Sequence, residues 1–178
     1  MTIPTLELPQ LDAAIRRGAR IAMQSDPPSA LDAERHQATY LDNLAHYRLV
    51  ASDCVASGDH RQAAEKSWGA FAQAIKAVSA ARGVLVTSHT DVLGVALKLA
   101  ALVREGDRTA GASLLNGCMT ARSLHQHFYE NDLAADEIPV LVRKVMRAVD
   151  LLEGSVLTNG QSGAEAAANG LSDQGGKA

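Results

Sequence analysis

The chain has 178 residues, with 17 Lys and Arg against 20 Asp and Glu, which gives a formal net charge of -3. This length can bury one sizeable core, and an apolar content of 47% excludes the fibrous and intrinsically disordered classes. The weakly acidic balance supplies no global field that attracts nucleic acid. Any contact with nucleic acid must therefore use a local cluster of Lys and Arg, or positive charges that several subunits of an oligomer bring together.

Aromatic residues make up only 3% of the chain, and alanine is abundant. A core of Ala, Leu and Val favours close contacts between helices, with Trp68 as the expected anchor. Apolar residues recur at helical spacing in six segments, which predicts an all-α, antiparallel bundle of five to six helices. In chain order the predicted helices cover residues 8–23, 29–57, 61–82, 88–106, 108–130 and 136–153.

Capping residues predict where these helices begin and end. Ser29 and Ser88 each precede an Asp by three residues, a spacing typical of a helix N-terminus. Gly58 followed by Asp59 predicts a tight hairpin between the second and third helices, because Gly favours the position just after a helix and Asp caps the next one. The third helix, with Trp68 on its apolar stripe, is the expected centre of the core.

The predicted organisation is one bundle with two short appendages. Residues 1–28 hold the first helix and a Pro-rich break, residues 29–153 hold the bundle, and residues 154–178 form a disordered tail rich in Gly, Ser and Asn. No secretory signal pattern is evident, and the longest apolar stretch, residues 94–103, is too short for a membrane span. We therefore expect a cytoplasmic protein.

Metal or cofactor sites have no sequence signature in this chain. Cys54 and Cys118 lack metal-ligand spacing and are expected to be reduced, partly buried thiols. His125 and His127 diverge by about 200° on a helix, which suits no shared metal ion. We expect neither a metal nor another cofactor.

The stretch from Arg122 to Tyr129 reads Arg-Ser-Leu-His-Gln-His-Phe-Tyr and gathers a guanidinium, two imidazoles and a phenol. In the spacing Arg122-x4-His127-x-Tyr129, the imidazole can move the proton of a ribose 2′-hydroxyl while the guanidinium binds the phosphate, without a metal. Tyr129 would orient the phosphate or the base. The pattern predicts Arg122 and His127 as catalytic residues.

Helix geometry supports a structural alternative for the same stretch. Five residues rotate a side chain by about 140°, so Arg122 and His127 point to different sides of an ideal helix unless it ends, bulges or meets a second subunit. His125 shares a face with Tyr129 and is expected to be the more buried imidazole. In this alternative Arg122 pairs with Glu130 or Asp132.

A third hypothesis is a small-molecule site inside the bundle. Its predicted lining consists of Trp68, His89, His125 and Tyr129. His89 lies in the first turn of the fourth helix, where an imidazole can otherwise bond free backbone groups.

Several motifs resemble those of the HEPN superfamily of helical proteins. They are residues 58–68 with Ala74-Ile-Lys76, the pair Ser88-His89, and the Arg-x4-His-x-Tyr pattern of HEPN toxins. The segments Ala-Glu-Lys-Ser-Trp-Gly-Ala, Ala-Ile-Lys-Ala and Ser-Leu-His-Gln-His-Phe-Tyr-Glu more closely resemble the PaREP family, whose helices are HEPN-like. The resemblance covers residues 52–153.

The two resemblances imply different functions. HEPN toxins imply a metal-independent endoribonuclease acting across a homodimer interface, with Arg122 and His127 as the catalytic pair. They also imply a nucleotidyltransferase-type antitoxin that modifies Tyr129. The PaREP resemblance rests on Leu124-His125 and Phe128-Tyr-Glu130 and does not include His127. Two classes of function follow, a HEPN-like nucleic-acid-directed protein and a non-catalytic helical binding or assembly module.

Overall fold

The structure is a computed structural model that describes residues 7–19 and 28–154. These residues form six helices and no strand, which confirms the predicted all-α bundle. Nearly all of the predicted tail and most of the Pro-rich break lie outside the described residues. The helices are α1 (Leu8–Gly18), α2 (Ala30–Ser57), α3 (His60–Ala80), α4 (His89–Gly106), α5 (Arg108–Glu130) and α6 (Ile138–Leu152).

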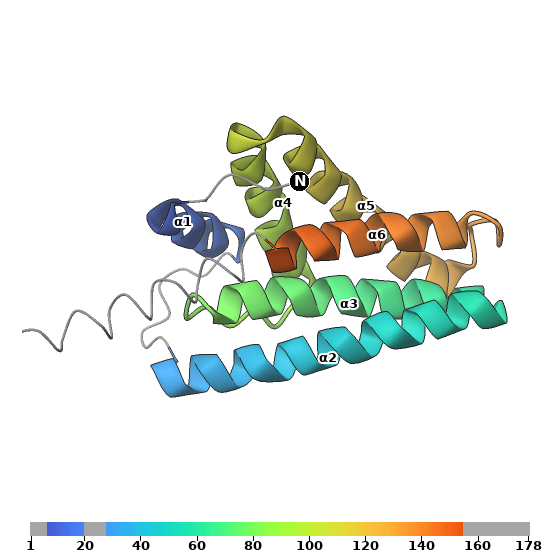
Figure 1. Cartoon of the computed structure of the whole chain (residues 1–178), viewed down its shortest axis with the longest axis horizontal. Coiled ribbons are helices and arrows are strands. Elements are labelled where there is room, and N and C mark those ends of the chain that lie inside the picture. Colours follow the sequence, from blue (N-terminus) through green and yellow to red (C-terminus); the bar gives the residue numbers. More distant parts are fainter. Residues whose placement is uncertain (1–6, 20–27, 155–178) are drawn as a thin grey trace, which may run out of the picture.

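The hairpin of α2 and α3 forms one side of the molecule, with the two helices running antiparallel and side by side (Figure 1). α6 lies along α3. Beyond these two helices, α4 and α5 pack together, and α1 packs on α4 at one end of the molecule. α3 contacts α2, α4, α5 and α6, and Trp68 on it is only 4% exposed. The prediction that this helix is the centre of the core is confirmed.

The predicted caps form as the sequence indicates. The Oγ atoms of Ser29 and Ser88 accept the backbone N–H of Asp32 and Asp91, each at 3.1 Å. Gly58 ends α2 with a φ of 78°, a left-handed conformation that favours glycine. These caps fix where α2, α3 and α4 begin, and with them the side of the bundle on which the first turn of α4 lies.

Several helix boundaries differ from the prediction, and α3 ends at Ala80 rather than at Arg82. The first helix was expected to continue to Met23 but ends at Gly18, and residues 20–27 lie outside the described residues. The last helix begins at Ile138 rather than at Asp136, with Pro139 in its first turn. Proline is favoured there because the first N–H groups of a helix have no intrahelical partner. None of the helices in the described part of the chain has the length and hydropathy that a bilayer span requires.

A glycine contact seats α1 on α4. A Cβ atom added at Gly94 would overlap the carbonyl oxygen of Gly18, and one added at Gly18 would overlap the backbone of Val95. Leu11 and Ile15 of α1 are buried in the common core, and Asp12 pairs with Arg82 at 2.6 Å. α1 is therefore part of the same hydrophobic core as the other helices.

We expect Gly94→Ala to lower the free energy of unfolding by about 2 kcal/mol or more, because the new methyl group has to push the two helices apart. Urea unfolding measures the loss, and faster trypsin cleavage after Arg16 or Arg17 reports the loosening of α1. Gly154→Ala is the control, since a Cβ there meets nothing within 4 Å. Equal stability of the Gly94 variant and this control would contradict the contact.

Cys118 on α5 gives the fold a dependence on alkaline pH. Burial raises the pKa of its thiol from 9.0 to about 11, and the nearby Arg122 opposes the shift. Between these pH values the unfolded chain loses the thiol proton and the folded chain keeps it. Stability is therefore fully present below about pH 9 and falls as the pH rises toward 11.

The buried Cys118 thiol should lower the free energy of unfolding by at most about 1.4 kcal/mol for each pH unit above pH 9. Cys118→Ala should remove this loss. The measurement is the difference in unfolding free energy between variant and wild type, taken at several pH values from neutral to alkaline. A constant difference across that range would contradict the buried thiol. Cys54→Ala leaves the thiol of Cys118 in place and should keep the part of the pH dependence that comes from Cys118, although burial raises the pKa of the Cys54 thiol as well.

Candidate functional site

Four of the six predicted site residues meet where the second half of α5 crosses α3 and the start of α4. The His125 ring stacks on Trp68 with centroids 5.0 Å apart and ring planes 25° apart. His89 meets the His125 ring edge-on at 5.0 Å, and Tyr129 does so at 5.3 Å. Together with Glu65 these residues are called the His125 cluster.

Local sequence explains how three helices supply this cluster. Glu65 and Trp68 are three residues apart on α3, and His125 and Tyr129 are four apart on α5, so each pair shares a helix face. The Ser88 cap makes His89 the first residue of α4. His89 makes ring contacts with Trp68 and His125 here, rather than the backbone bond that its helix position suggested.

A carboxylate orients the His125 imidazole. Glu65 Oε2 lies 2.8 Å from Nδ1 of His125, and the two side chains are 27% and 20% exposed. The carboxylate can only accept, so Nδ1 carries the proton and Nε2 of the neutral ring keeps its lone pair. A carboxylate in this position also stabilises the imidazolium that forms when Nε2 takes up a proton.

The inner side of the His125 cluster is buried, and its outer side is exposed to solvent. Trp68 is buried, while His89 is exposed and Tyr129 is 66% exposed. A ligand can therefore approach Tyr129 and His89 from solvent. The five grooves found on the described part of the molecule are lined by other residues.

Arg122 lies on the same side of α5 as the cluster. Seven residues rotate a side chain to within about 20° of its starting direction, so Arg122, one turn before His125, shares a face with Tyr129. It is exposed and forms no ion pair within the described parts of the chain. The predicted pairing of Arg122 with Glu130 or Asp132 is wrong, because Glu130 instead accepts a bond from Gln126 at 2.7 Å.

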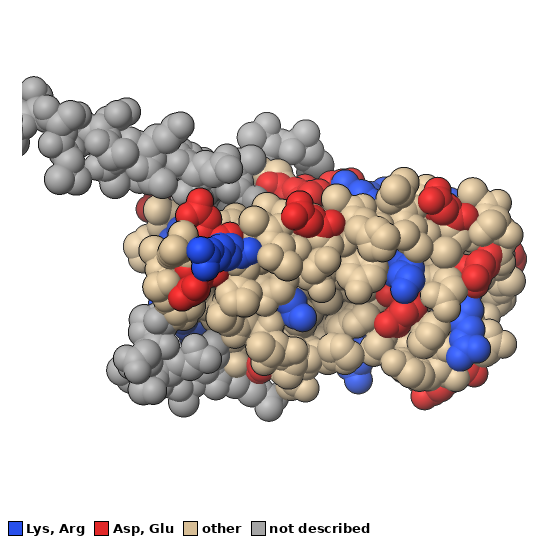
Figure 2. All heavy atoms as spheres, turned by 90° about the horizontal axis from the view of Figure 1, so that it is seen from below, with Lys and Arg blue, Asp and Glu red and all other residues tan. Residues whose placement is uncertain are grey.

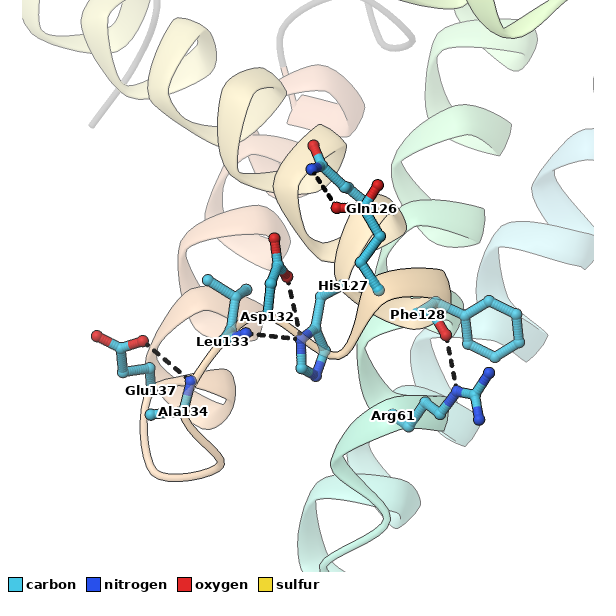
Figure 3. Close-up of polar contacts among 9 residues, drawn as sticks. Arg61, Gln126, His127, Phe128, Asp132, Leu133, Ala134 and Glu137 are labelled. Atoms are coloured by element: carbon cyan, nitrogen blue, oxygen red, sulfur yellow. Dashed lines mark hydrogen bonds and ion pairs between the residues drawn. The ribbon is translucent and has the colours of Figure 1, made fainter.

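His127 is held by the loop that follows α5 (Figure 3). The backbone N–H of Leu133 donates to its Nδ1 at 3.0 Å, and Asp132 Oδ1 lies 3.4 Å from the same atom. His127 is only 3% exposed, whereas His125 is half-buried. The expectation that His125 is the more buried imidazole is therefore wrong. The structure gives no contact between His127 and Arg122.

The left-handed Asn131 explains why this imidazole is turned inward. Asn131 ends α5 with a φ of 52° and donates its N–H to the carbonyl of His127. Asn tolerates this conformation better than most residues. The reversal of the chain then brings Leu133 back onto the His127 ring.

Arg61 at the start of α3 fastens the end of α5. Its Nε donates to the carbonyl oxygen of Phe128 at 2.7 Å, and its guanidinium lies 4.9 Å from the centre of the Phe128 ring (Figure 3). Arg61 and Glu65, one turn apart, thus both bind α5. Sequence reasoning assigned neither residue to the site, and the signal that could have found them was their place in the segment, residues 58–68, that resembles the HEPN and PaREP motifs.

The described residues contain no group of three or more His, Cys, Asp or Glu side chains placed to hold a metal ion. What the His125 cluster can supply is proton transfer at Nε2, hydrogen bonding from the Tyr129 phenol and stacking on exposed rings. Arg122 adds a cation on the same face.

Comparison with protein families matches residues 39–149 to the archaeal PaREP1/PaREP8 family. This segment is well over half of the chain, runs from α2 into α6, and contains the entire His125 cluster with Arg122 and His127. No curated protein and no solved structure matches the chain.

His127→Ala should lower the free energy of unfolding by about 2–4 kcal/mol, because it leaves a cavity and strips the Leu133 N–H of its acceptor. Urea unfolding measures the loss, and faster hydrogen exchange at Leu133 locates it. His36→Ala, at an exposed position of α2, should change stability by no more than about 0.5 kcal/mol. If both variants are equally stable, His127 has no structural role.

Proposed function

The chain belongs to the archaeal PaREP1/PaREP8 family, and we propose that it is a HEPN-like, nucleic-acid-directed protein that cleaves RNA without a metal ion. The observation that carries this proposal is the part-buried Glu65–His125 pair at 2.8 Å, whose imidazole lies on the same side of α5 as the exposed, unpaired Arg122. An oriented base beside a free guanidinium is what phosphodiester cleavage by the neighbouring hydroxyl requires.

In the proposed reaction, Nε2 of His125 takes the proton from the ribose 2′-hydroxyl. The 2′-oxygen then attacks phosphorus and the 5′-oxygen of the next nucleotide leaves, which yields a 2′,3′-cyclic phosphate and a 5′-hydroxyl. Glu65 stabilises the imidazolium, and Arg122 stabilises the negative charge that accumulates on the phosphate. Tyr129 or His89 supplies the proton of the leaving oxygen, and their exposed rings offer stacking surfaces for bases.

In this proposal the general base is His125, whereas the Arg-x4-His pattern predicts His127. His127 is 3% exposed and its Nδ1 already accepts a hydrogen bond, so the ring would have to leave the loop before it met a phosphate. A second subunit would not relieve this burial, because residues of the same chain cause it. The Arg122 and His127 pair nevertheless remains a distinct prediction that mutation can separate from the His125 site.

Two partners belong to the proposal. A homodimer formed through the α5 face would place two His125 clusters near each other. Tyr129 is the residue that a nucleotidyltransferase-type antitoxin would modify, since its side chain is 66% exposed. Modification there would add bulk and negative charge beside His125 and would block RNA.

The second candidate function is a non-catalytic binding or assembly module. Leu31 and Leu49 on α2 are 57% and 62% exposed, which offers apolar anchors to another protein. On the face seen from below the α2–α3 hairpin, acidic and basic side chains are interspersed over a largely uncharged surface (Figure 2). That face suits a protein partner better than an RNA backbone, which requires clustered cations.

The test is cleavage of single-stranded RNA in EDTA by the wild-type protein and by single variants. We expect His125→Ala to lower the rate by about 10²- to 10⁴-fold, as loss of a general base does. Glu65→Gln should lower the rate by a smaller factor, because the neutral amide no longer stabilises the positive charge that forms on the imidazole during the reaction. Arg122→Ala should also lower the rate, and His36→Ala should not.

The outcomes distinguish the hypotheses. If His127→Ala abolishes cleavage in a folded protein and His125→Ala does not, the Arg122 and His127 pair is the active site. If the wild-type protein leaves RNA intact, or if all variants cleave equally, the nuclease proposal fails. Stoichiometric co-purification with a protein partner that Leu49→Asp disrupts would then support the assembly module.

A further inference from the structure

A polar groove between α5 and α6 lies apart from the His125 cluster. Its volume is about 440 Å³, and Ser113, Asn116 and Thr120 of α5 line one wall while Lys144 and Arg147 of α6 line the other. Gly117 lies between the walls and packs closely against Ala148, where a Cβ atom would overlap the alanine methyl group. The two helices thus meet at Gly117, and polar side chains stand above this contact.

All five polar side chains of the groove are free to bind a ligand. None of them forms a hydrogen bond or an ion pair within the residues that the structure describes, in contrast to Ser67, Ser79 and Ser123, whose hydroxyl groups donate to the carbonyl four residues earlier. No Asp or Glu lines the groove. Asp150, one turn beyond Arg147, is engaged by Arg48 at 3.0 Å.

The groove and the His125 cluster face different ways. Thr120 and Tyr129 are nine residues apart, which corresponds to a rotation of about 180° around α5. A ligand in the groove therefore contacts none of the residues assigned to RNA cleavage. Ligand binding in the groove can therefore be tested separately from RNA cleavage at the His125 cluster.

We propose that this groove binds a phosphate group. Lys144 and Arg147 supply two positive charges one turn apart on α6, and the hydroxyl and amide groups of α5 supply neutral donors opposite them. A phosphate carries two or more oxygens that accept from both walls at once, and charged donors give such bonds most of their strength. The volume accommodates a small organic phosphate or one phosphate of an RNA backbone.

The experiment titrates the full chain with inorganic pyrophosphate and, separately, with a short single-stranded RNA, following amide signals of Gly117 and Thr120 by NMR. Lys144→Gln and Arg147→Gln should each weaken binding by about 10-fold or more, the effect of losing one charged hydrogen bond. Arg143→Gln is the matched control. It removes the same charge from α6, but Arg143 lines a different groove, toward α2, and binding should change by less than about 2-fold.

Binding of pyrophosphate that depends on Lys144 and Arg147 assigns the groove to small phosphates. Binding of RNA alone with the same dependence assigns it to a nucleic-acid backbone, and both results support the proposal. Thr120→Val, which keeps the charges, should weaken binding by a few fold if the ligand lies in the groove. The proposal is overturned if neither probe binds, or if Arg143→Gln weakens binding as much as Lys144→Gln does.

Discussion

The packing of α5 against α3 is the contact on which the rest of the structure depends. Trp68 is buried beneath His125, Glu65 binds the same imidazole, and Arg61 binds the carbonyl of Phe128. These contacts lie along one side of α3 and set the direction in which α5 leaves the core. The same contacts build the candidate site, so structural and chemical roles of α3 cannot be separated by deleting Trp68 or Arg61.

Local sequence patterns predicted most of the fold but only part of the candidate site. Apolar spacing and the residues Ser29, Gly58 and Ser88 predicted the helices because capping and amphipathic burial depend on neighbours in the chain. The end of α1 was misplaced: the helix ends at Gly18, which packs against α4, a contact between distant segments. Periodicity cannot report such a contact.

The two imidazoles of α5 show the limit of sequence inference at the site. Their helix positions alone made His125 the inner residue and His127 the outer one. The loop after Asn131 reverses this order, because its left-handed turn returns the Leu133 backbone to the His127 ring. Glu65 was equally hidden, since a partner 60 residues away leaves no local pattern. Trp68, His89, His125 and Tyr129 do lie together as predicted, whereas the small-molecule site that they were predicted to line stays a prediction.

Asp107 is shared by two helices, since it both ends α4 and caps α5 through the N–H groups of Thr109 and Ala110. A junction of one residue gives these helices no slack, so they have to tilt as one unit about this corner. His89 begins the first helix of the pair, far from the corner, and His125 lies near the end of the second. Because the two helices share this one-residue junction, it helps to hold the rings of His89 and His125 at their separation of 5.0 Å.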